Sequence, residues 1–181
     1  MPSLSTDPKM TSKETILVVD DEAGPRESLR MILEPRYEVH TASDGQEALR
    51  LINNKDIDVV TLDLKMPGLS GIEVLKEIRK FKPNTEVIII TGYGTLTNAQ
   101  EAMRFGAGDF ISKPFNVSEI ISIVANSFER RGYNLKIKSL IERIQGLRPT
   151  GNDVHKSDQF FSRNRREGDL GPKGPEELIN H

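Results

Sequence analysis

The sequence predicts an α/β fold in which a five-stranded parallel sheet is covered by helices on both faces. Five short apolar runs occur in the first 115 residues, and stretches with helical spacing separate them. Three of the runs are nearly continuous in Val, Ile and Leu, which is typical of strands whose two faces are both covered. Alternating strands and helices build such a layered fold, and right-handed crossovers place helices on each side of the sheet.

Strands are expected at the apolar runs and helices between them. The predicted strands are residues 16–20, 37–42, 58–63, 86–91 and 109–112. Five stripes of apolar residues with helical spacing predict the helices. These stripes are Leu29, Ile32 and Leu33; Ala48, Leu49 and Ile52; Ile72, Leu75 and Ile78; Ala99, Ala102 and Met103; and Ile120, Ile121, Val124 and Phe128.

Capping signals agree with three of the helix starts. In each, a polar residue is followed three positions later by Glu, which is the spacing of a capping box. The pairs are Asp44 with Glu47, Ser70 with Glu73, and Asn116 with Glu119. Gly106 and Gly108 predict the end of the fourth helix, because glycine commonly follows a helix C-terminus.

The pattern changes near the end of the fifth helix. Gly132 offers one end for that helix. Beyond it, apolar residues follow one another at spacings of 4, 3, 4 and 3: Tyr133, Ile137, Leu140, Ile144 and Leu147. This is a heptad pattern only about two repeats long. We expect residues 133–147 to form a helical linker, with pairing of two copies through these heptads as the alternative.

The two ends of the chain carry no pattern that would build a core. Residues 1–13 are polar, and residues 148–181 combine few apolar side chains with repeated Gly and Pro. Such segments bury too little apolar surface to order the backbone. We therefore expect a flexible N-terminus at 1–13, one folded domain at 14–132 and a disordered, flexible tail at 148–181.

Composition excludes several classes of protein. The formal net charge is −2, which gives no global electrostatic reason to bind nucleic acid or an acidic membrane. The chain has no cysteine, which excludes disulfides and thiolate metal sites and suits a reducing cytoplasm. No apolar run approaches the length needed to cross a bilayer, and no signal peptide is recognised at the start. A soluble, cytoplasmic protein is expected.

Chemically active side chains gather at the predicted strand ends. Asp20 and Asp21, followed by Glu22, lie at the end of the first predicted strand. The third strand ends at Asp63, the fourth at Thr91, and the fifth just before Lys113. In an open parallel sheet, ligands bind beyond these carboxyl ends. Clustered carboxylates repel one another, and a hard cation resolves the conflict. Because Mg²⁺ prefers oxygen ligands and is commonly held together with phosphate, the sequence predicts a Mg²⁺ site, with Mn²⁺ also able to fit.

With such an ion, Asp63 is placed to attack phosphorus. Phosphoryl transfer needs positioning and charge neutralisation more than other covalent chemistry. Lys113 would supply a point charge for one phosphoryl oxygen, and Thr91 a hydroxyl donor for another. The structural alternatives are a helix cap for Asp20 and Asp21, an ordinary strand-end threonine, and a solvated lysine.

Four motifs resemble the receiver domain of two-component response regulators. They are VVDDE at 18–22, LDLKMPGLSG at 62–71, Thr91-Gly92 at a strand end, and KPF at 113–115. The resemblance covers residues 14–132 and implies a flavodoxin-like, doubly wound sheet of strand order 2-1-3-4-5. It also implies specific roles: Asp63 as phosphoacceptor, Asp20 and Asp21 as the acidic pair, a metal contact through the backbone carbonyl of Lys65, and a cis Lys113–Pro114 bond.

The resemblance extends to residues that would convey the signal. Thr91 and Phe110 occupy its switch positions, although an aromatic side chain in a strand is equally often a packing residue. Lys65 and Tyr93 each lie two positions beyond a motif residue, where receivers tune dephosphorylation. Their identity predicts an altered lifetime of the phosphorylated state, in a direction that the sequence leaves open.

The predicted function is therefore a phosphorylation-activated receiver rather than a turnover enzyme. A histidine kinase or a histidine phosphotransfer protein would phosphorylate Asp63, and the chain would catalyse only its own phosphorylation and dephosphorylation. The face built by the fourth helix, fifth strand and fifth helix would then contact a downstream protein or a second copy.

Two alternatives stay open. A phosphatase of the haloacid dehalogenase type also uses a strand-end Asp with Mg²⁺, but it needs a second Asp where this chain has Lys65. The other alternative is the regulatory half of a transcriptional regulator that lacks its output module. The Gly/Pro-rich end disfavours a helix-turn-helix, and no GxxxxGK[ST] motif of an ATPase occurs, so direct DNA binding is not expected.

Overall fold

The computed structural model describes residues 13–146. The predicted disordered tail, the last heptad residue Leu147 and almost all of the predicted flexible N-terminus lie outside the described residues. By its contacts the chain divides into two units, residues 1–139 and 140–181. Of the second unit, only the end of the last helix is described.

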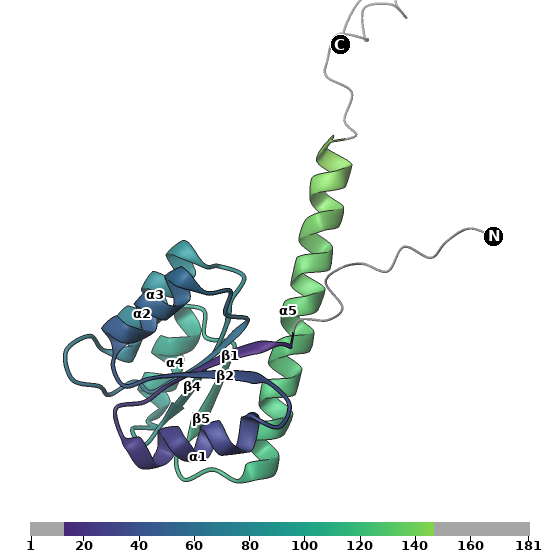
Figure 1. Cartoon of the computed structure of the whole chain (residues 1–181). Helices are drawn as coiled ribbons and strands as arrows, with labels where there is room; N and C mark the ends of the chain where they lie inside the picture. Colours follow the sequence, from purple (N-terminus) through teal and green to yellow (C-terminus); the bar gives the residue numbers. More distant parts are fainter. Residues whose placement is uncertain (1–12, 147–181) are drawn as a thin grey trace, which may run out of the picture. The chain divides into compact units, whose positions relative to one another are not determined.

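Five strands alternate with five helices, as the sequence predicts (Figure 1). The elements are β1 Thr15–Val19, α1 Ala23–Leu33, β2 Glu38–Ala42, α2 Gly45–Asn54, β3 Val59–Leu62, α3 Gly71–Phe81, β4 Glu86–Thr91, α4 Leu96–Arg104, β5 Asp109–Ser112 and α5 Val117–Gly146. The predicted strands differ from the observed ones by one residue at most at either end.

The strands form one parallel sheet of order β2-β1-β3-β4-β5, which confirms the doubly wound topology. In the centre of the sheet, Leu17 of β1 lies opposite Val60 of β3, and Val60 lies opposite Val87 of β4. Since all strands run in one direction, their carboxyl ends share one edge of the sheet. The chain reverses its strand order between β1 and β3, which is where ligands bind in such folds.

Two apolar cores cover the two faces of the sheet. On one face, side chains of α2, α3 and α4 such as Ile52, Leu75 and Ala102 pack on the strands. On the other face, the covering side chains come from α1 and α5 and include Leu29 and Ile120. Strands β1 and β3 are buried along nearly their whole length, which explains their continuous aliphatic sequences.

The predicted N-caps are present. The side chains of Asp44, Ser70 and Asn116 accept hydrogen bonds from the backbone N–H groups of Glu47, Glu73 and Glu119. Ser70 and Glu73 form the complete reciprocal capping box. Gly106, with φ of 91°, follows α4 as expected.

The helix end proposed at Gly132 is not used. The last helix continues through this residue to Gly146. A glycine inside a helix costs only about 1 kcal/mol relative to alanine, which the flanking turns readily outweigh.

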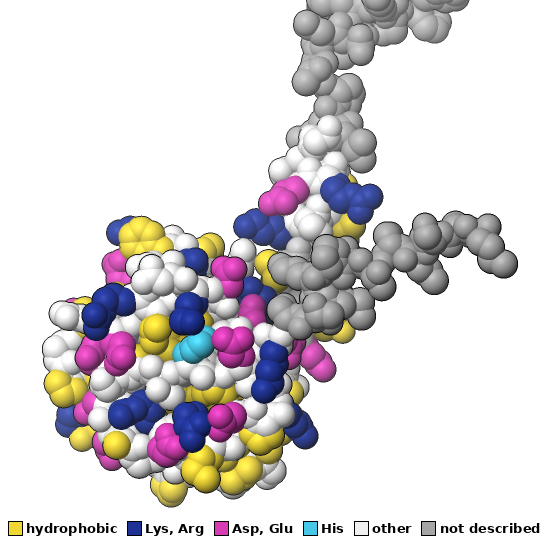
Figure 2. All heavy atoms as spheres, in the orientation of Figure 1, with side chains coloured by type: hydrophobic (Ala, Val, Ile, Leu, Met, Phe, Trp, Pro, Cys, Tyr) yellow, Lys and Arg dark blue, Asp and Glu magenta, His cyan; other side chains and the backbone are white. Residues whose placement is uncertain are grey.

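The surface is mixed in charge. Figure 2 shows Lys and Arg side chains intermingled with Asp and Glu over the face in view, in keeping with the small net charge. Within residues 13–146, no helix combines the length and the apolar character that crossing a membrane requires.

Candidate functional site

The structure brings the five strand-end residues together at the carboxyl edge of the sheet. Asp20 and Asp21 follow β1, Asp63 follows β3, Thr91 ends β4, and Lys113 follows β5. One carboxylate oxygen from each of the three aspartates lies within 4.8 Å of the other two. Three acidic groups from two separate segments therefore meet at one point.

Lys113 is held between two of these carboxylates. Its Nζ lies 2.7 Å from Oδ2 of Asp20 and 2.7 Å from Oδ2 of Asp63. Asp20 and Asp63 are only 1% and 4% exposed. Buried charges without partners are costly, so the lysine supplies the compensation that these carboxylates need.

The environment of Lys113 favours its charged form. Burial alone lowers the pKa of this ammonium group, but the hydrogen bonds to Asp20 and Asp63 outweigh burial and raise the pKa above its ordinary value. The Lys113–Pro114 bond is cis, as the resemblance implied.

Backbone amides orient the two buried carboxylates. The N–H of Glu22 donates to Oδ1 of Asp20 at 2.9 Å, and the N–H of Lys65 donates to Oδ1 of Asp63 at 3.1 Å. Each carboxylate thus has one oxygen on a backbone amide and the other on Lys113. This arrangement fixes both groups before any ligand arrives.

Arg26 of α1 ties down the loop that carries the acidic pair. Its guanidinium donates to the backbone carbonyl of Asp20 at 2.6 Å and to that of Asp21 at 3.4 Å. This contact could not be predicted from the sequence, because an arginine that reaches back to a preceding loop follows no periodic pattern.

The donor set fits a hard divalent cation. Three carboxylates offer the oxygen ligands that Mg²⁺ and Mn²⁺ prefer. Lys113 contributes only one positive charge to this cluster of three acidic side chains. Asp21 is the most open of the three, so it faces solvent while Asp20 and Asp63 lie deeper.

Thr91 lies at the same edge and is fully buried. Its Oγ1 accepts a hydrogen bond of 3.2 Å from the N–H of Tyr93, and its carbonyl accepts one of 2.9 Å from the N–H of Lys113. The threonine therefore connects the loop after β4 to the residue that holds Asp63.

Helix α3 begins directly against the backbone of Asp63. The N–H of Gly71 donates to the carbonyl of Leu64 at 3.0 Å. A Cβ added to Gly71 would collide with the backbone carbonyl oxygen of Asp63. Only glycine permits this approach, so the glycine that ends the 62–71 motif also sets the position of Asp63.

A hollow of about 350 Å³ opens above Asp63. Its lining residues are Asp21, Glu22, Asp63, Lys65, Met66, Pro67, Gly92 and Tyr93. Two of these lining residues touch each other: Nζ of Lys65 donates to the hydroxyl of Tyr93 at 2.6 Å and lies 3.9 Å from the centre of the tyrosine ring. The sequence singled out both residues, but it carried no signal that they touch.

Phe110 is half-buried in β5 and packs against the core on the α2–α4 side of the sheet. This position agrees equally with a packing residue and with a side chain that changes rotamer.

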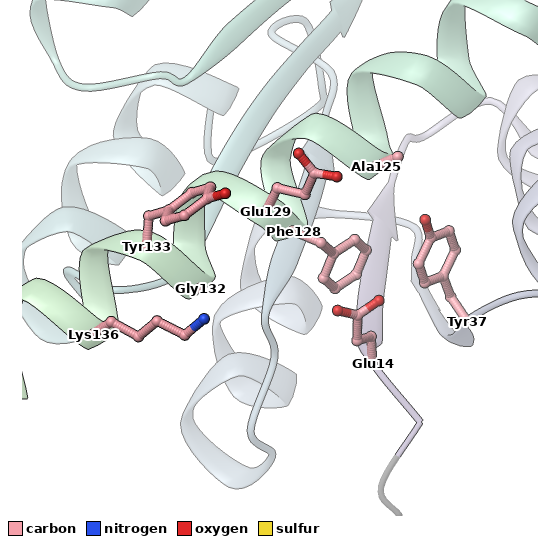
Figure 3. Close-up of a pocket in the computed structure, with 8 residues that line it drawn as sticks. All are labelled: Glu14, Tyr37, Ala125, Phe128, Glu129, Gly132, Tyr133 and Lys136. Atoms are coloured by element: carbon pink, nitrogen blue, oxygen red, sulfur yellow. The ribbon is translucent and has the colours of Figure 1, made fainter. Parts of the chain in front are cut away.

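A larger hollow, of about 530 Å³, lies elsewhere and contains none of the five strand-end residues (Figure 3). It lies beside α5, and its lining includes Glu14, Tyr37 and Tyr133. The stacked rings of Tyr37 and Phe128, 4.6 Å apart, form part of its floor. The candidate site is therefore identified by the convergence of charged groups and not by the size of a hollow.

Comparison with known proteins agrees with this geometry. The family model for the response regulator receiver domain matches residues 16–125. The chain is 37% identical over 136 residues to the regulatory protein AtoC of Escherichia coli, covering 75% of this chain and 30% of AtoC. It is 35% identical over 144 residues to the transcriptional regulatory protein SrrA of Staphylococcus aureus, covering 79% of this chain and 54% of SrrA.

Solved structures give the same result. A CheY-like receiver domain protein from Methanospirillum hungatei superposes with a TM-score of 0.66 at 31% identity, covering 68% of this chain and 99% of that one. NtrX from Brucella abortus, solved in complex with ADP, superposes with a TM-score of 0.68 at 36% identity, covering 71% of this chain and 30% of NtrX. The chain thus spans a third to a half of the length of AtoC, SrrA and NtrX. Since the family model covers more than half of the chain, this protein belongs to the family of response regulator receiver domains.

Proposed function

We propose that Asp63 accepts a phosphoryl group from a phosphohistidine and that the chain is switched by this modification. One observation carries the proposal: the buried carboxylate of Asp63 lies under an open hollow, with Lys113 on one side and two further carboxylates beside it. Receiver domains are phosphate-accepting regulators that interact with histidine kinases or phosphotransfer proteins. The kinase or phosphotransfer protein is the partner we assign to this hollow, and the exchange would take place in the cytoplasm.

The reaction forms one bond and breaks one. An oxygen of Asp63 attacks phosphorus in line, the P–N bond to the donor imidazole breaks, and its electron pair returns to the imidazole nitrogen. The product is an acyl phosphate on Asp63. Attack by water at phosphorus later releases inorganic phosphate and restores the carboxylate, so each phosphorylation is reversed without another enzyme.

The acidic groups would hold the cation that this chemistry needs. We assign Asp20, Asp21, Asp63 and the backbone carbonyl of Lys65 as ligands of Mg²⁺, which when bound neutralises charge on the phosphoryl oxygens. The hydrogen bond from the N–H of Lys65 keeps Asp63 oriented as the nucleophile. Lys113, already 2.7 Å from Asp63, would shift its ammonium to a phosphoryl oxygen.

The signal would start at Thr91. Adding a phosphoryl group places about two negative charges near this hydroxyl. For the hydroxyl to turn inward as a donor, the hydrogen bond that it accepts from Tyr93 must change, so the loop before α4 moves with it. We propose that this movement, together with Phe110, alters the α4-β5-α5 face, which a downstream protein or a second copy then contacts.

Lys65 and Tyr93 would set how long the phosphorylated state lasts. Both residues line the hollow at Asp63, and they are in contact with each other. We propose that this contact shields the acyl phosphate and prolongs its lifetime. The sequence predicted a changed lifetime without a direction, and the contact between Lys65 and Tyr93 supports the direction proposed here.

Two alternatives are less well supported. A haloacid dehalogenase-type phosphatase needs a second Asp two residues beyond the nucleophile, and Lys65 occupies that position with its amine bound to Tyr93. A role as the regulatory half of a transcriptional regulator is favoured by the likeness to AtoC and SrrA, both longer than this chain. It differs from the main proposal only in the output, because the phosphorylated residue would be the same.

The experiment is phosphorylation by a small donor. Incubating the protein with Mg²⁺ and phosphoramidate should add one phosphoryl group to the intact mass, and EDTA should prevent it. Asp63→Asn should abolish the addition, whereas Asp109→Asn, at the other end of β5, should retain it. Labelling that persists in Asp63→Asn would overturn the assignment.

A further inference from the structure

The hollow beside α5, of about 530 Å³, lies at the other end of β1 from the acidic cluster. Glu14 lines this hollow and directly precedes β1, whereas Asp20 directly follows the same strand. A strand rises about 3.3 Å per residue, so about 20 Å separate these two residues. The phosphoryl transfer proposed above therefore gives this hollow no role.

Two carboxylates in the hollow have no cation bound to them. Glu14 and Glu129 both line it, and both are exposed. Within residues 13–146, neither forms an ion pair, and the same is true of Lys136, the basic residue of the lining. The guanidinium of Arg131 lies near Glu14, but Asp58 holds it at 2.7 Å. The lining thus carries two negative charges and one positive charge, none of them paired.

The electrostatics of Glu14 show the lack of a cation. Burial and then the charge of Asp58 raise the pKa of Glu14 above its ordinary value, and the charge of Arg131 offsets them only in part. Burial, and after it the charge of Glu14, also raises the pKa of Tyr37. A positive charge placed in the hollow would oppose the effects of burial and of Asp58 on the carboxylate.

The floor of the hollow is aromatic. The rings of Tyr37 and Phe128 are stacked with an angle of 11° between their planes, and both residues are 7% exposed. In the view of Figure 3, the ring of Phe128 lies between the carboxyl groups of Glu14 and Glu129. The hydroxyl of Tyr37 forms no hydrogen bond with any residue in the range 13–146, so this buried tyrosine has an acceptor to offer.

A third ring forms one wall. Tyr133 is 64% exposed and lines the hollow from α5 (Figure 3). The amine of Lys136 lies 5.9 Å from the centre of this ring, which is within the range of a cation–π contact. The ring of Tyr133 is therefore accessible to a positive charge. Lys136 is itself exposed, so it has room to move aside for another cation.

Carboxylates beside aromatic rings suit a guanidinium group. Guanidinium is planar, donates through five N–H groups in a fixed fork, stacks on aromatic faces and is more weakly hydrated than an ammonium. A metal ion fits less well, because it needs several oxygen ligands close together. Among residues 13–146, the one group of three or more side chains spaced for a metal is the cluster of Asp20, Asp21 and Asp63.

The shape of the hollow suits the end of a side chain. Four of its eight lining residues are exposed, so it is shallow. Sites for small molecules enclose most of their ligand and are mainly apolar, unlike this one. We propose that the hollow beside α5 binds the guanidinium group of an arginine on a partner protein. Its carboxylates are Glu14 and Glu129, and its rings are those of Tyr37, Phe128 and Tyr133.

This contact is independent of the phosphoryl transfer proposed above. The hollow contains none of the five strand-end residues, so a partner that binds here does not cover Asp63. Ion pairs with exposed carboxylates are individually weak, so a single arginine binds with a millimolar Kd. The arginine is thus one contact within a wider interface.

A blocked tripeptide, acetyl-Gly-Arg-Gly-amide, provides the first test. Added to the natural protein, it should shift the NMR amide signals of Glu14, Tyr37 and Glu129 with one saturating, millimolar Kd. The same peptide with citrulline in place of arginine keeps the shape without the charge and should bind at least about tenfold more weakly. The lysine peptide should bind about threefold more weakly, since its ammonium has no planar fork. No shifts with the arginine peptide, or equal binding of either other peptide, would overturn the proposal.

Variants of the lining provide the second test. Glu14→Gln and Glu129→Gln should each weaken binding of the arginine peptide about two- to fivefold. Lys136→Met removes a competing cation and should strengthen binding about twofold. Glu101→Gln is the matched control, because Glu101 is an exposed glutamate that lines a different hollow on α4, and it should change nothing. Unchanged binding in both Glu14→Gln and Glu129→Gln, or equal weakening by Glu101→Gln, would overturn the proposal.

The two proposals are separated by exchanging their variants. Asp63→Asn should bind the arginine peptide as the natural protein does, and Glu14→Gln should still be labelled by phosphoramidate and Mg²⁺. Loss of peptide binding in Asp63→Asn would overturn the assignment of the arginine to the hollow beside α5.

Discussion

The ammonium of Lys113 lies 2.7 Å from a carboxylate oxygen of Asp63, although fifty residues separate the two in the chain. The contact exists because β3 and β5 end at the same edge of the sheet, with only β4 between them. It pairs Asp63, the proposed acceptor, with a cation and orients its carboxylate at the carboxyl edge of the sheet.

Removing this lysine should destabilise the protein. Lys113→Met leaves Asp20 and Asp63 buried without a cation, and breaking a buried ion pair costs about 3–5 kcal/mol. We expect the free energy of unfolding to fall by about that amount without divalent ions and to recover partly with Mg²⁺, which would replace the missing charge. Urea denaturation with and without Mg²⁺ measures both. Lys138→Met, on the exposed side of α5, is the matched control and should change little. An unchanged stability in Lys113→Met would contradict the role given to this contact.

Replacing Thr91 should separate phosphorylation from signalling. Thr91→Val keeps the shape of a fully buried side chain and removes only the hydroxyl that accepts from Tyr93. We expect Asp63 still to be phosphorylated, while the amide chemical shifts of α4 and β5 change much less on phosphorylation than in the natural protein. NMR spectra recorded before and after phosphoramidate test this, and Thr91→Ser should restore the response. If the chemical shifts of Thr91→Val change as much on phosphorylation as those of the natural protein, the hydroxyl does not take part in signalling.

The lifetime of the acyl phosphate should depend on Lys65 and Tyr93 as a pair. A cation on an aromatic ring at an exposed site is worth about 0.5–1 kcal/mol, so losing the contact should speed dephosphorylation about two- to fivefold. Lys65→Met and Tyr93→Leu should have similar effects, and the double variant should add little to either. Release of inorganic phosphate gives the rate. Lys76 and Phe105 form a similar cation–ring contact away from the site, with the amine 4.0 Å from the ring centre. Lys76→Met, which removes that contact, is therefore the matched control. If Lys76→Met speeds release equally, shielding is not the cause.

Two glycines should respond in opposite directions to alanine. Gly71→Ala pushes a Cβ into the carbonyl of Asp63, so the backbone must shift at a cost of about 1–3 kcal/mol, and phosphorylation should slow. Gly132→Ala meets no neighbour and sits inside α5, where alanine should stabilise the helix by about 1 kcal/mol. Thermal unfolding and the rate of labelling by phosphoramidate distinguish the two. Equal stability changes would contradict the close approach of Gly71 to Asp63.

Local sequence patterns were enough to predict the helices and strands and to predict that the strand-end residues lie close together. Continuous aliphatic runs fix buried strands, and a parallel sheet brings every strand end to one edge, so Asp20, Asp63 and Lys113 could be placed together from their positions alone. The cap at Ser70 follows from its own side chain and Glu73, which is equally local information.

Contacts between side chains from different loops could not be predicted in this way. The bridge from Lys65 to Tyr93 depends on how far two loops extend, and the bond from Arg26 to the Asp20 carbonyl depends on one long rotamer. The end of α5 was left open by the sequence for a different reason. A glycine such as Gly132 ends a helix only where the residues after it do not favour a helix. Here the helix continues to Gly146, at a small cost in free energy.

The most direct test of the central claim identifies the residue that carries the phosphoryl group. Borohydride reduces an acyl phosphate to an alcohol, so a phosphorylated aspartate becomes homoserine, which peptide mass spectrometry distinguishes from aspartate. After phosphorylation with phosphoramidate and Mg²⁺ and then reduction, we predict homoserine at position 63 and aspartate at positions 20 and 21. Homoserine at position 20 or 21, or a phosphoryl group that resists borohydride, would contradict the account.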